Sequence, residues 1–271
     1  MARARELGIT IGDGRPGPHA AITDVPGVRV GHATIIEGEG NLVVGRGPIR
    51  TGVTVIEPRA GPIWDEPVFA GCERLNGAGE MTGLEWVRES GLLTSPIAIT
   101  NTHSVGIVRD ALVEMEIQHR PPDGHFWSLP VVGETWDGVL NDVNGLHVRR
   151  EHLFQALATA AGGPVEEGNV GGGTGMICHG FKGGIGTASR IIAAEDGGYT
   201  VGVLVQANHG RRPRLRIDGV PVGSLLPASR IPLPGHPGPQ QGSGSIIVVV
   251  ATDAPLLPHQ CRRLAQRAGI G

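Results

Sequence analysis

The chain has 271 residues, of which 39% are hydrophobic, so its composition is typical of a folded globular protein rather than of a disordered one. Its 23 Lys and Arg against 26 Asp and Glu give a formal net charge of −3 without a long basic block, which argues against nucleic acid as a partner. No apolar run approaches the roughly 18 residues of a membrane span, and the N-terminus has no signal-peptide core, so we expect a cytoplasmic protein without membrane contact.

The strand candidates are rich in Val, Ile and Thr and are bounded by Gly or Pro. They cover residues 28–34, 52–57, 96–101, 130–133, 184–192, 200–207 and 245–252. Because these runs show little polar alternation, they predict sheets that are covered on both faces. We therefore expect residues 1–271 to form a single layered α/β domain.

Four helices are expected between and after these strands. Residues 85–89 continue from a glycine-rich segment at 76–83, and a second helix follows Ser104, which can cap it. Apolar residues at helical spacing mark a third helix at 153–160. Asp253 and an early proline predict the start of a fourth helix near the end of the chain. The Pro/Gly-rich connection at 213–241 is too long for an ordinary turn, which is typical of a functional or mobile loop.

The stretch QQGSGSIIVVVATD places two Gly-Ser pairs directly before a buried strand. A serine that opens such a strand after a glycine fits an autoproteolytic N-terminal nucleophile, since glycine tolerates the unusual backbone angles that expose its carbonyl to the next hydroxyl. Cleavage would free the α-amine of the serine, whose reference pKa of about 7.7–8.0 suits a general base. We favour Ser245 over Ser243 because Ser245 abuts the strand. The alternative is that the pair forms only a hinge or a strand cap.

Polar residues at strand ends supply further candidates. Glu134 and Trp136 follow one strand, and Asn208 ends another, where it could also merely cap a turn. The glycine run at 171–175 lacks a phosphate-binding pattern, so we expect it to pack closely on the backbone or to form a nest of N–H groups beside the nucleophile.

A metal site is not expected from the sequence. His103, His179 and His209 are scattered without a ligand-like spacing. The cysteines are odd in number and far apart, which indicates reduced, mostly buried thiols; they are Cys72, Cys178 and Cys261.

Long motifs along nearly the whole chain resemble the DmpA-type family of self-processing serine aminopeptidases, which includes L-aminopeptidase/D-esterases and β-peptidyl aminopeptidases. They include ITDVPGVRVGHATI, TGVTVIEPR, ETWDGVLNDVNG, GNVGGGTGMICHGFKGGIGTASR, VQANHGRRP and GSIIVVVATDAPLLPHQ. The resemblance implies a four-layer αββα sandwich like that of N-terminal nucleophile hydrolases, and a homo-oligomer, usually a tetramer. It implies no metal or organic cofactor.

Site roles follow from the same resemblance. The scissile bond falls on Gly244-Ser245, the oxyanion-hole asparagine on Asn208, and the acidic residue that receives the free amino group of the substrate on Glu134. Trp136 stands where many members have a tyrosine, and its indole N–H can donate a hydrogen bond but cannot transfer a proton as a phenol can.

The family's pattern continues beyond Gly271, so the resemblance implies a fold that is incomplete at its C-terminus. Residues 1–244 would correspond to the large subunit and residues 245–271 to the start of the small one.

We therefore expect a self-cleaving serine aminopeptidase that releases N-terminal residues from peptides, amino-acid amides or esters through an acyl-enzyme on Ser245. One alternative is a truncated, non-catalytic relative that acts as a binding or scaffold protein. Another is an acyltransferase of similar fold, like ornithine acetyltransferase, although that type uses a threonine nucleophile.

Overall fold

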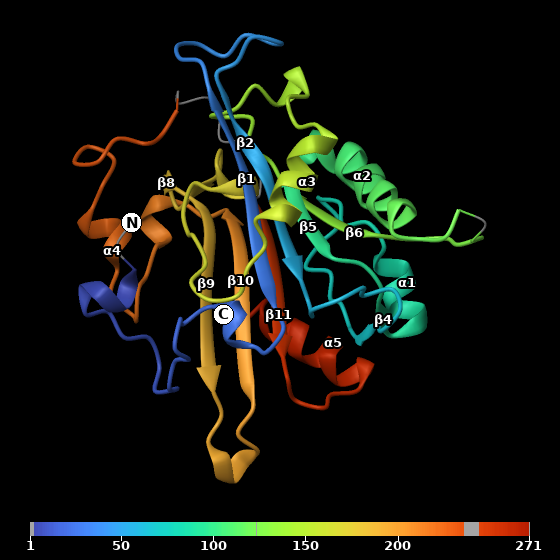
Figure 1. The fold of residues 1–271 in the computed structure, drawn as a ribbon. Helices are drawn as coiled ribbons and strands as arrows, with labels where there is room; N and C mark the ends of the chain where they lie inside the picture. The colour runs from blue at the N-terminus through green and yellow to red at the C-terminus, as the bar shows by residue number, and fades with distance from the viewer. Residues whose placement is uncertain (1–2, 123, 236–243, 271) are drawn as a thin grey trace.

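The computed structural model of the chain describes residues 3–122, 124–235 and 244–270, and it contains two main β-sheets (Figure 1). The first sheet has the strand order β1-β2-β5-β6, in which only β5 and β6 run parallel. The second has the order β11-β10-β9 and is antiparallel throughout. The strands of the first sheet are Arg29–Glu37, Ile49–Glu57, Ile97–Asn101 and Val131–Thr135 in chain order. Those of the second are β9 (Gly184–Ile191), β10 (Thr200–Asn208) and β11 (Ser245–Thr252).

Two short hairpin-like pairs accompany these sheets. One joins β3 (Val68–Phe69) to β4 (Leu92–Leu93), and the other joins β7 (Ile177–Cys178) to β8 (Phe181–Lys182). The α-helices are α1 (Leu84–Ser90), α2 (Val105–Gln118), α3 (Arg150–Ala158), α4 (Val222–Leu225) and α5 (Pro258–Arg267). Short 3-10 turns lie at Ala4–Leu7, Ile22–Asp24, Thr102–Ser104, Val143–Gly145, Gly171–Gly173, Ala194–Asp196 and Arg212–Arg214.

Strand β2 contributes side chains to two hydrophobic cores, one on each face of the first sheet. Val53 and Val55 pack with α2 and α3, which lie side by side over the first sheet (Figure 1). Ile56 faces the other way and packs with Leu204 and Val249 of the second sheet. The chain is thus layered as helices, sheet and sheet, because β2 is apolar on both faces.

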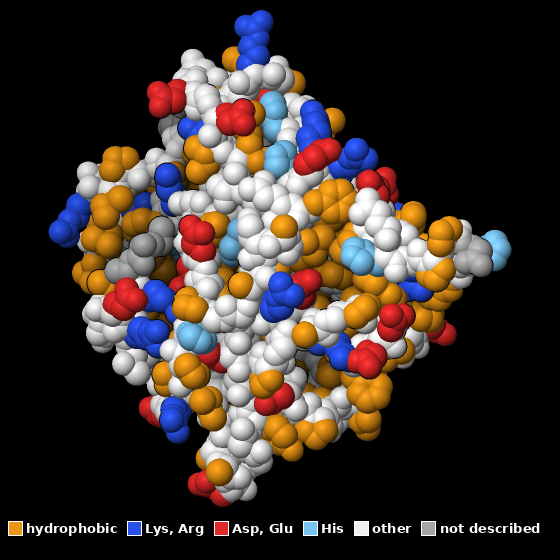
Figure 2. Space-filling model, viewed as in Figure 1, with side chains coloured by type: hydrophobic (Ala, Val, Ile, Leu, Met, Phe, Trp, Pro, Cys, Tyr) orange, Lys and Arg blue, Asp and Glu red, His pale blue; other side chains and the backbone are white. Residues whose placement is uncertain are grey.

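Each predicted strand is present, with its ends within three residues of the expected bounds, and the layered α/β class is confirmed. The strands of the two short pairs were not predicted from the sequence, because two residues are too few to give a periodic signal. On the face that Figure 2 shows, acidic and basic side chains are interspersed, in agreement with the balanced charge. Within the described residues, no helix is long and apolar enough to cross a membrane.

The predicted caps were wrong in two places. Helix α5 begins at Pro258, and Asp253 instead accepts a hydrogen bond from the Thr200 N–H at 2.7 Å, which ties the end of β11 to β10. Ser104 occupies the N-cap position of α2 but makes no capping hydrogen bond through its side chain. The side chain of Asn101 accepts from the His103 N–H in the preceding turn instead.

The connection predicted at 213–241 contains the short helix α4 in its described part. Residues 236–243, and with them the alternative nucleophile Ser243, lie outside the described residues.

Candidate active site

Ser245 is the first residue of β11, directly after a glycine with an unusual backbone. Gly244 has a φ of +73°, and a Cβ at this position would lie 2.7 Å from the Cα of His209. Both the positive φ and the close backbone approach exclude larger side chains here. The structure therefore gives the physical reason for glycine before Ser245.

Strand register brings Asn208 to Ser245. The two residues are direct partners across the antiparallel β10-β11 pair, and the Asn208 Nδ2 donates to the Ser245 Oγ at 3.0 Å. The other end of the carboxamide is fixed, since Oδ1 accepts from the Ile177 N–H at 2.9 Å. A backbone N–H can face only an acceptor, so the NH2 group must point toward the serine.

Trp136 contacts Ser245 through its backbone. Its N–H donates to the Ser245 Oγ at 3.1 Å, and its carbonyl accepts from the Asn208 Nδ2 at 2.7 Å. The Trp136 residue is 45% exposed. The peptide N–H of Trp136 makes this contact, whereas the indole N–H was the donor expected from the sequence. The Ser245 oxygen thus faces two N–H donors, from Asn208 and from the Trp136 backbone.

Glu134 lies on β6, two residues before Trp136, and is only 5% exposed. Its Oε1 accepts from the Glu80 N–H at 3.1 Å, and its Oε2 accepts from the Thr102 hydroxyl. A Cβ at Gly79 would lie 2.8 Å from Oε1, so a glycine there lets the 76–83 segment approach the carboxylate. The carboxylate is held by two neutral donors and retains lone pairs for a third.

Glu134 and Ser245 line the same open groove, which has a volume of about 1920 Å³. Strand β11 forms one wall, and the 76–83 segment and α1 form another part of the lining. A groove lined by a buried carboxylate and by a hydroxyl flanked by N–H donors is a candidate substrate-binding site.

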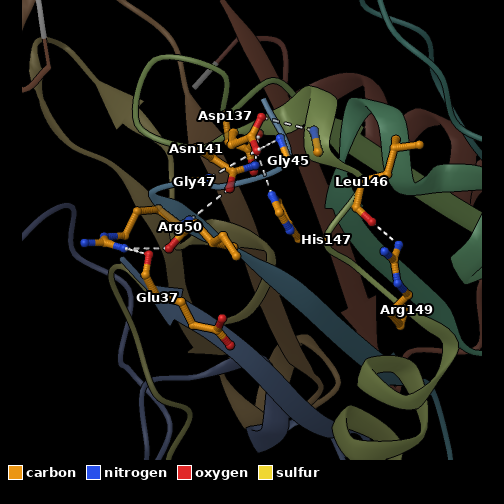
Figure 3. A network of polar contacts seen from close by, with 12 residues as sticks. Glu37, Gly45, Gly47, Arg50, Asp137, Asn141, Leu146, His147 and Arg149 are labelled. Carbon is orange, nitrogen blue, oxygen red and sulfur yellow. Dashed lines mark hydrogen bonds and ion pairs between the residues drawn. The ribbon is translucent and has the colours of Figure 1, made fainter. Parts of the chain in front are cut away.

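The loop after Trp136 is anchored by a buried polar network (Figure 3). Asn141 donates to the Asp137 carboxylate at 3.0 Å and accepts from the Arg50 N–H of β2 at 2.9 Å. Burial raises the pKa of Asp137 to about 6, although hydrogen bonds from Thr51 and Asn141 lower it. Asp137, which is 1% exposed, directly follows Trp136, so the network anchors the chain immediately after Trp136.

The same loop supports the β1-β2 hairpin (Figure 3). The Asp142 Oδ2 accepts from the Gly45 N–H at 2.7 Å and contacts the His147 Nε2 at 2.8 Å. Burial raises the pKa of Asp142, but hydrogen bonds from His147, Gly45 and Gly47 outweigh it and hold the pKa below its ordinary value.

Several supporting residues were missed by the sequence argument. Gln206 is fully buried and donates to the Thr135 hydroxyl at 2.7 Å, which joins the ends of β10 and β6 beside the site. A glutamine at an inward position of an apolar strand is the signal that could have revealed it. The glycine run packs closely on β1 and β2, with the Gly171 N–H donating to Thr34 and the Gly172 N–H to Thr54. This is the close backbone packing that we expected, rather than a nest at the nucleophile.

Two histidines that look scattered in the sequence are neighbours in space. The rings of His179 and His209 have centroids 5.3 Å apart, and Cys178 lies beside them. Among the described residues His103 is not part of this group.

The chain is similar to proteins of known family and structure. Residues 20–271 match the model of "Peptidase family S58". The chain is 54% identical over 99% of its length to the beta-peptidyl aminopeptidase BapA of Sphingosinicella microcystinivorans, of which it covers 69%. It is similar to a solved beta-aminopeptidase of a Burkholderia species, with a TM-score of 0.90 and 60% identity, covering 99% of this chain and 71% of that one.

A second solved structure connects the fold with a catalytic class. The L-aminopeptidase D-Ala-esterase/amidase of Ochrobactrum anthropi, described as a prototype for the serine aminopeptidases and a variant of the N-terminal nucleophile hydrolase fold, has a TM-score of 0.85 and 48% identity. The match covers 99% of this chain and 72% of the Ochrobactrum anthropi chain. The resemblance, fold class and enzyme class expected from the motifs are confirmed, and the chain belongs to peptidase family S58 as a serine aminopeptidase of the N-terminal nucleophile type.

Proposed function

We propose that Ser245 is both the site of self-cleavage and the nucleophile of the aminopeptidase. The observation that carries this proposal is the position of its Oγ, at the start of β11 after a left-handed Gly244 and within 3.1 Å of two N–H donors. The strand and the two donors hold this hydroxyl in one position, which supports a role as a pre-organised nucleophile.

Self-cleavage begins with attack of the Ser245 Oγ on the carbonyl carbon of Gly244. The C–N bond breaks, an ester links Gly244 to the hydroxyl oxygen, and the proton passes to the released α-amine. Water then hydrolyses the ester. The products are residues 1–244, which end in a carboxylate, and residues 245–271, which begin with a free Ser245.

The freed α-amine is the general base for substrate turnover. It takes the proton of the Ser245 hydroxyl as the oxygen attacks the substrate carbonyl, and it returns that proton to the leaving amine. Asn208 Nδ2 and the Trp136 N–H, which already point at the nucleophile, stabilise the oxyanion. The acyl-enzyme is then hydrolysed by water along the same route.

Glu134 selects substrates with a free amino terminus. Its carboxylate is fixed by Glu80 and Thr102 and faces the groove that Ser245 lines. A charge-assisted contact with an ammonium group is stronger than a neutral one, so acylated termini would bind poorly. This makes the enzyme an exopeptidase.

We place peptides and amides with an N-terminal β-amino acid first among the substrates. Two of the relatives described above are named as β-peptidyl or beta-aminopeptidases, at 54% and 60% identity, whereas the L-aminopeptidase D-Ala-esterase/amidase is 48% identical. Amino-acid amides, α-peptides and D-esters follow as secondary substrates.

Three further expectations remain part of the proposal. The family resemblance supports a homo-oligomer, a tetramer, which sedimentation analysis would test. The charge and hydropathy of the chain support a cytoplasmic location, which cell fractionation would test. The chemistry above uses only side chains and backbone groups of the chain and requires no cofactor.

The testing experiment compares a β-homoamino-acid amide with its N-acetylated form. The wild-type chain is expected to hydrolyse only the free amine, and Ser245→Ala is expected to hydrolyse neither. Equal turnover of the two forms would contradict the role of Glu134. Undiminished turnover by Ser245→Ala would contradict the nucleophile.

A further inference from the structure

Cys178, His179 and His209 form a cluster beside the active site that the proposed reaction does not use. One ligand atom of each residue lies within 4.8 Å of those of the other two. Cys178 ends β7, His179 lies in the turn between β7 and β8, and His209 directly follows β10. All three side chains are half-buried, so a small solute can reach them from solvent.

His179 is held in a conformation that few side chains adopt. Its φ is +51°, and its N–H donates to the His209 carbonyl at 2.6 Å. The Arg212 Nε donates to the His179 carbonyl at 3.1 Å. A Cβ at Gly210 would lie 2.4 Å from the His179 ring, so only a glycine there lets the ring pack directly on the backbone. Non-glycine residues with positive φ persist where the surroundings impose them, and they gather at functional sites.

The ring orientation of His179 suits a ligand. Its Nδ1 lies 3.2 Å from the Arg211 carbonyl, which can only accept, so Nδ1 carries the proton and Nε2 has the free lone pair. A histidine that binds a metal usually donates its other ring N–H to a carbonyl or carboxylate in this way. The hydrogen bond to Arg211 therefore occupies the Nδ1 of His179 and leaves its Nε2 for a ligand.

We propose that Cys178, His179 and His209 form a binding site for a thiophilic divalent cation, Zn²⁺ in the first place. One thiolate and two imidazoles are ligands that zinc prefers, and three protein ligands leave the fourth tetrahedral position to water. Zn–S and Zn–N bonds of about 2.3 and 2.0–2.1 Å place tetrahedral ligand atoms roughly 3.5 Å apart. The three ligand atoms, which all lie within 4.8 Å of one another, are therefore close to the spacing that a bound ion needs.

The cluster flanks the residue that faces the nucleophile. His209 directly follows Asn208, and the residue before Cys178, Ile177, holds the Asn208 Oδ1 through its N–H. A cation bound to both segments constrains the chain on each side of the Asn208 amide, and a change in its 3.0 Å contact with Ser245 lowers turnover. Zinc binding accordingly inhibits turnover. This effect rests on the proposed function, whereas the binding itself does not.

The test begins with binding alone. Purified metal-free chain is dialysed against Zn²⁺ and its metal content is measured, and Co²⁺ is used in parallel because a thiolate ligand gives it a near-ultraviolet charge-transfer band. We expect one bound ion per chain and the cobalt band in the wild type, Cys72→Ser and Cys261→Ser. Cys178→Ser should lose the band and bind zinc about 10-fold or more weakly, since even partners outside the ligand shell contribute that much.

A second variant covers the case in which Cys178→Ser fails to fold. His179→Asn retains a residue that tolerates positive φ and removes the imidazole, and it should weaken zinc binding to a similar degree. Zinc binding of equal strength in wild type, Cys178→Ser and His179→Asn, or a wild type without the cobalt band, would overturn the site.

Turnover is measured separately. Zn²⁺ should inhibit the wild type and leave Cys178→Ser unaffected at the same concentration. A zinc-loaded wild type with full turnover would overturn the inhibitory coupling. A chain without any turnover would instead count against the proposed function, and its zinc content would still decide the site.

Discussion

Asn208 and Ser245 lie directly opposite each other across two antiparallel strands, and the Asn208 Nδ2 is 3.0 Å from the Ser245 Oγ. A strand register, rather than a loop, therefore sets the distance between the two groups. Successive strand residues point to opposite faces, so a slip of one residue would turn the asparagine away from the serine. The rigid sheet accounts for the close placement of both groups.

Asn208→Ala should reduce kcat roughly 10²–10³-fold, the usual effect of removing one oxyanion donor. Asn208→Asp is the matched comparison, because it still accepts from the Ile177 N–H but presents no donor to Ser245. Both variants should lose turnover to a similar degree, as measured by steady-state kinetics on chain whose cleavage state is known by mass. An Asp variant with wild-type kcat would contradict the donor role.

Glu134→Gln should lower kcat/KM for substrates with a free amino terminus by about 10–100-fold, since a hydrogen bond to a charged group contributes about 1.5–3 kcal/mol. Its shape and its contact with the Glu80 N–H can persist, so the charge is the main change. Glu80→Gln is the control, because Glu80 contacts Glu134 through its backbone. If Glu134→Gln discriminated against N-acetylated substrates as strongly as the wild type does, the ammonium contact would be wrong.

Gly244→Ala should slow or abolish self-cleavage. The added Cβ would lie 2.7 Å from the His209 Cα, and the positive φ adds about 1–2 kcal/mol of strain. Gly61→Ala is a suitable control, since Gly61 has a φ of +81° with nothing within 4 Å of an added Cβ. The rate of appearance of the two fragments measures the effect, and a Gly244→Ala chain that is cut at the wild-type rate would argue against a conformational requirement.

Much of this arrangement could be predicted from the sequence because it depends on strands with strong β propensity. Ser245 opens β11 and Asn208 ends β10, so both positions follow from where apolar runs begin and end. The pairing of these two strands could not be predicted, since a long connection separates them and leaves their register undetermined. The hydrogen bond from the Trp136 backbone to Ser245 could not be predicted either, because the sequence does not determine the direction of a peptide N–H.

Asp137 gives the fold a pH dependence. Burial raises its pKa from 3.8 to about 6, so ionisation costs more in the folded than in the unfolded chain. Relative to Asp137→Asn, the wild type should therefore lose stability as the pH rises from about 4 to above 6, by on the order of 2–3 kcal/mol. Chemical denaturation at several pH values measures this difference. A difference between the two proteins that stays constant over this range would contradict it.

The cluster of Cys178, His179 and His209 illustrates the other limit of sequence reasoning. Cys178 and His209 are far apart in the chain, and the hydrogen bond from the His179 N–H to the His209 carbonyl joins their segments beside the end of β10. Spacing rules detect ligands on one helix or one loop, and they cannot detect a site assembled from separate strands.

Intact-mass analysis of the purified chain shows whether the bond between Gly244 and Ser245 is cleaved. We expect two species, residues 1–244 and residues 245–271, in the wild type and a single uncut chain in Ser245→Ala. A wild type that stays at its full mass of 28.2 kDa while it hydrolyses peptides would contradict self-cleavage as the step that frees the Ser245 amine. A cut at any other bond would contradict it too.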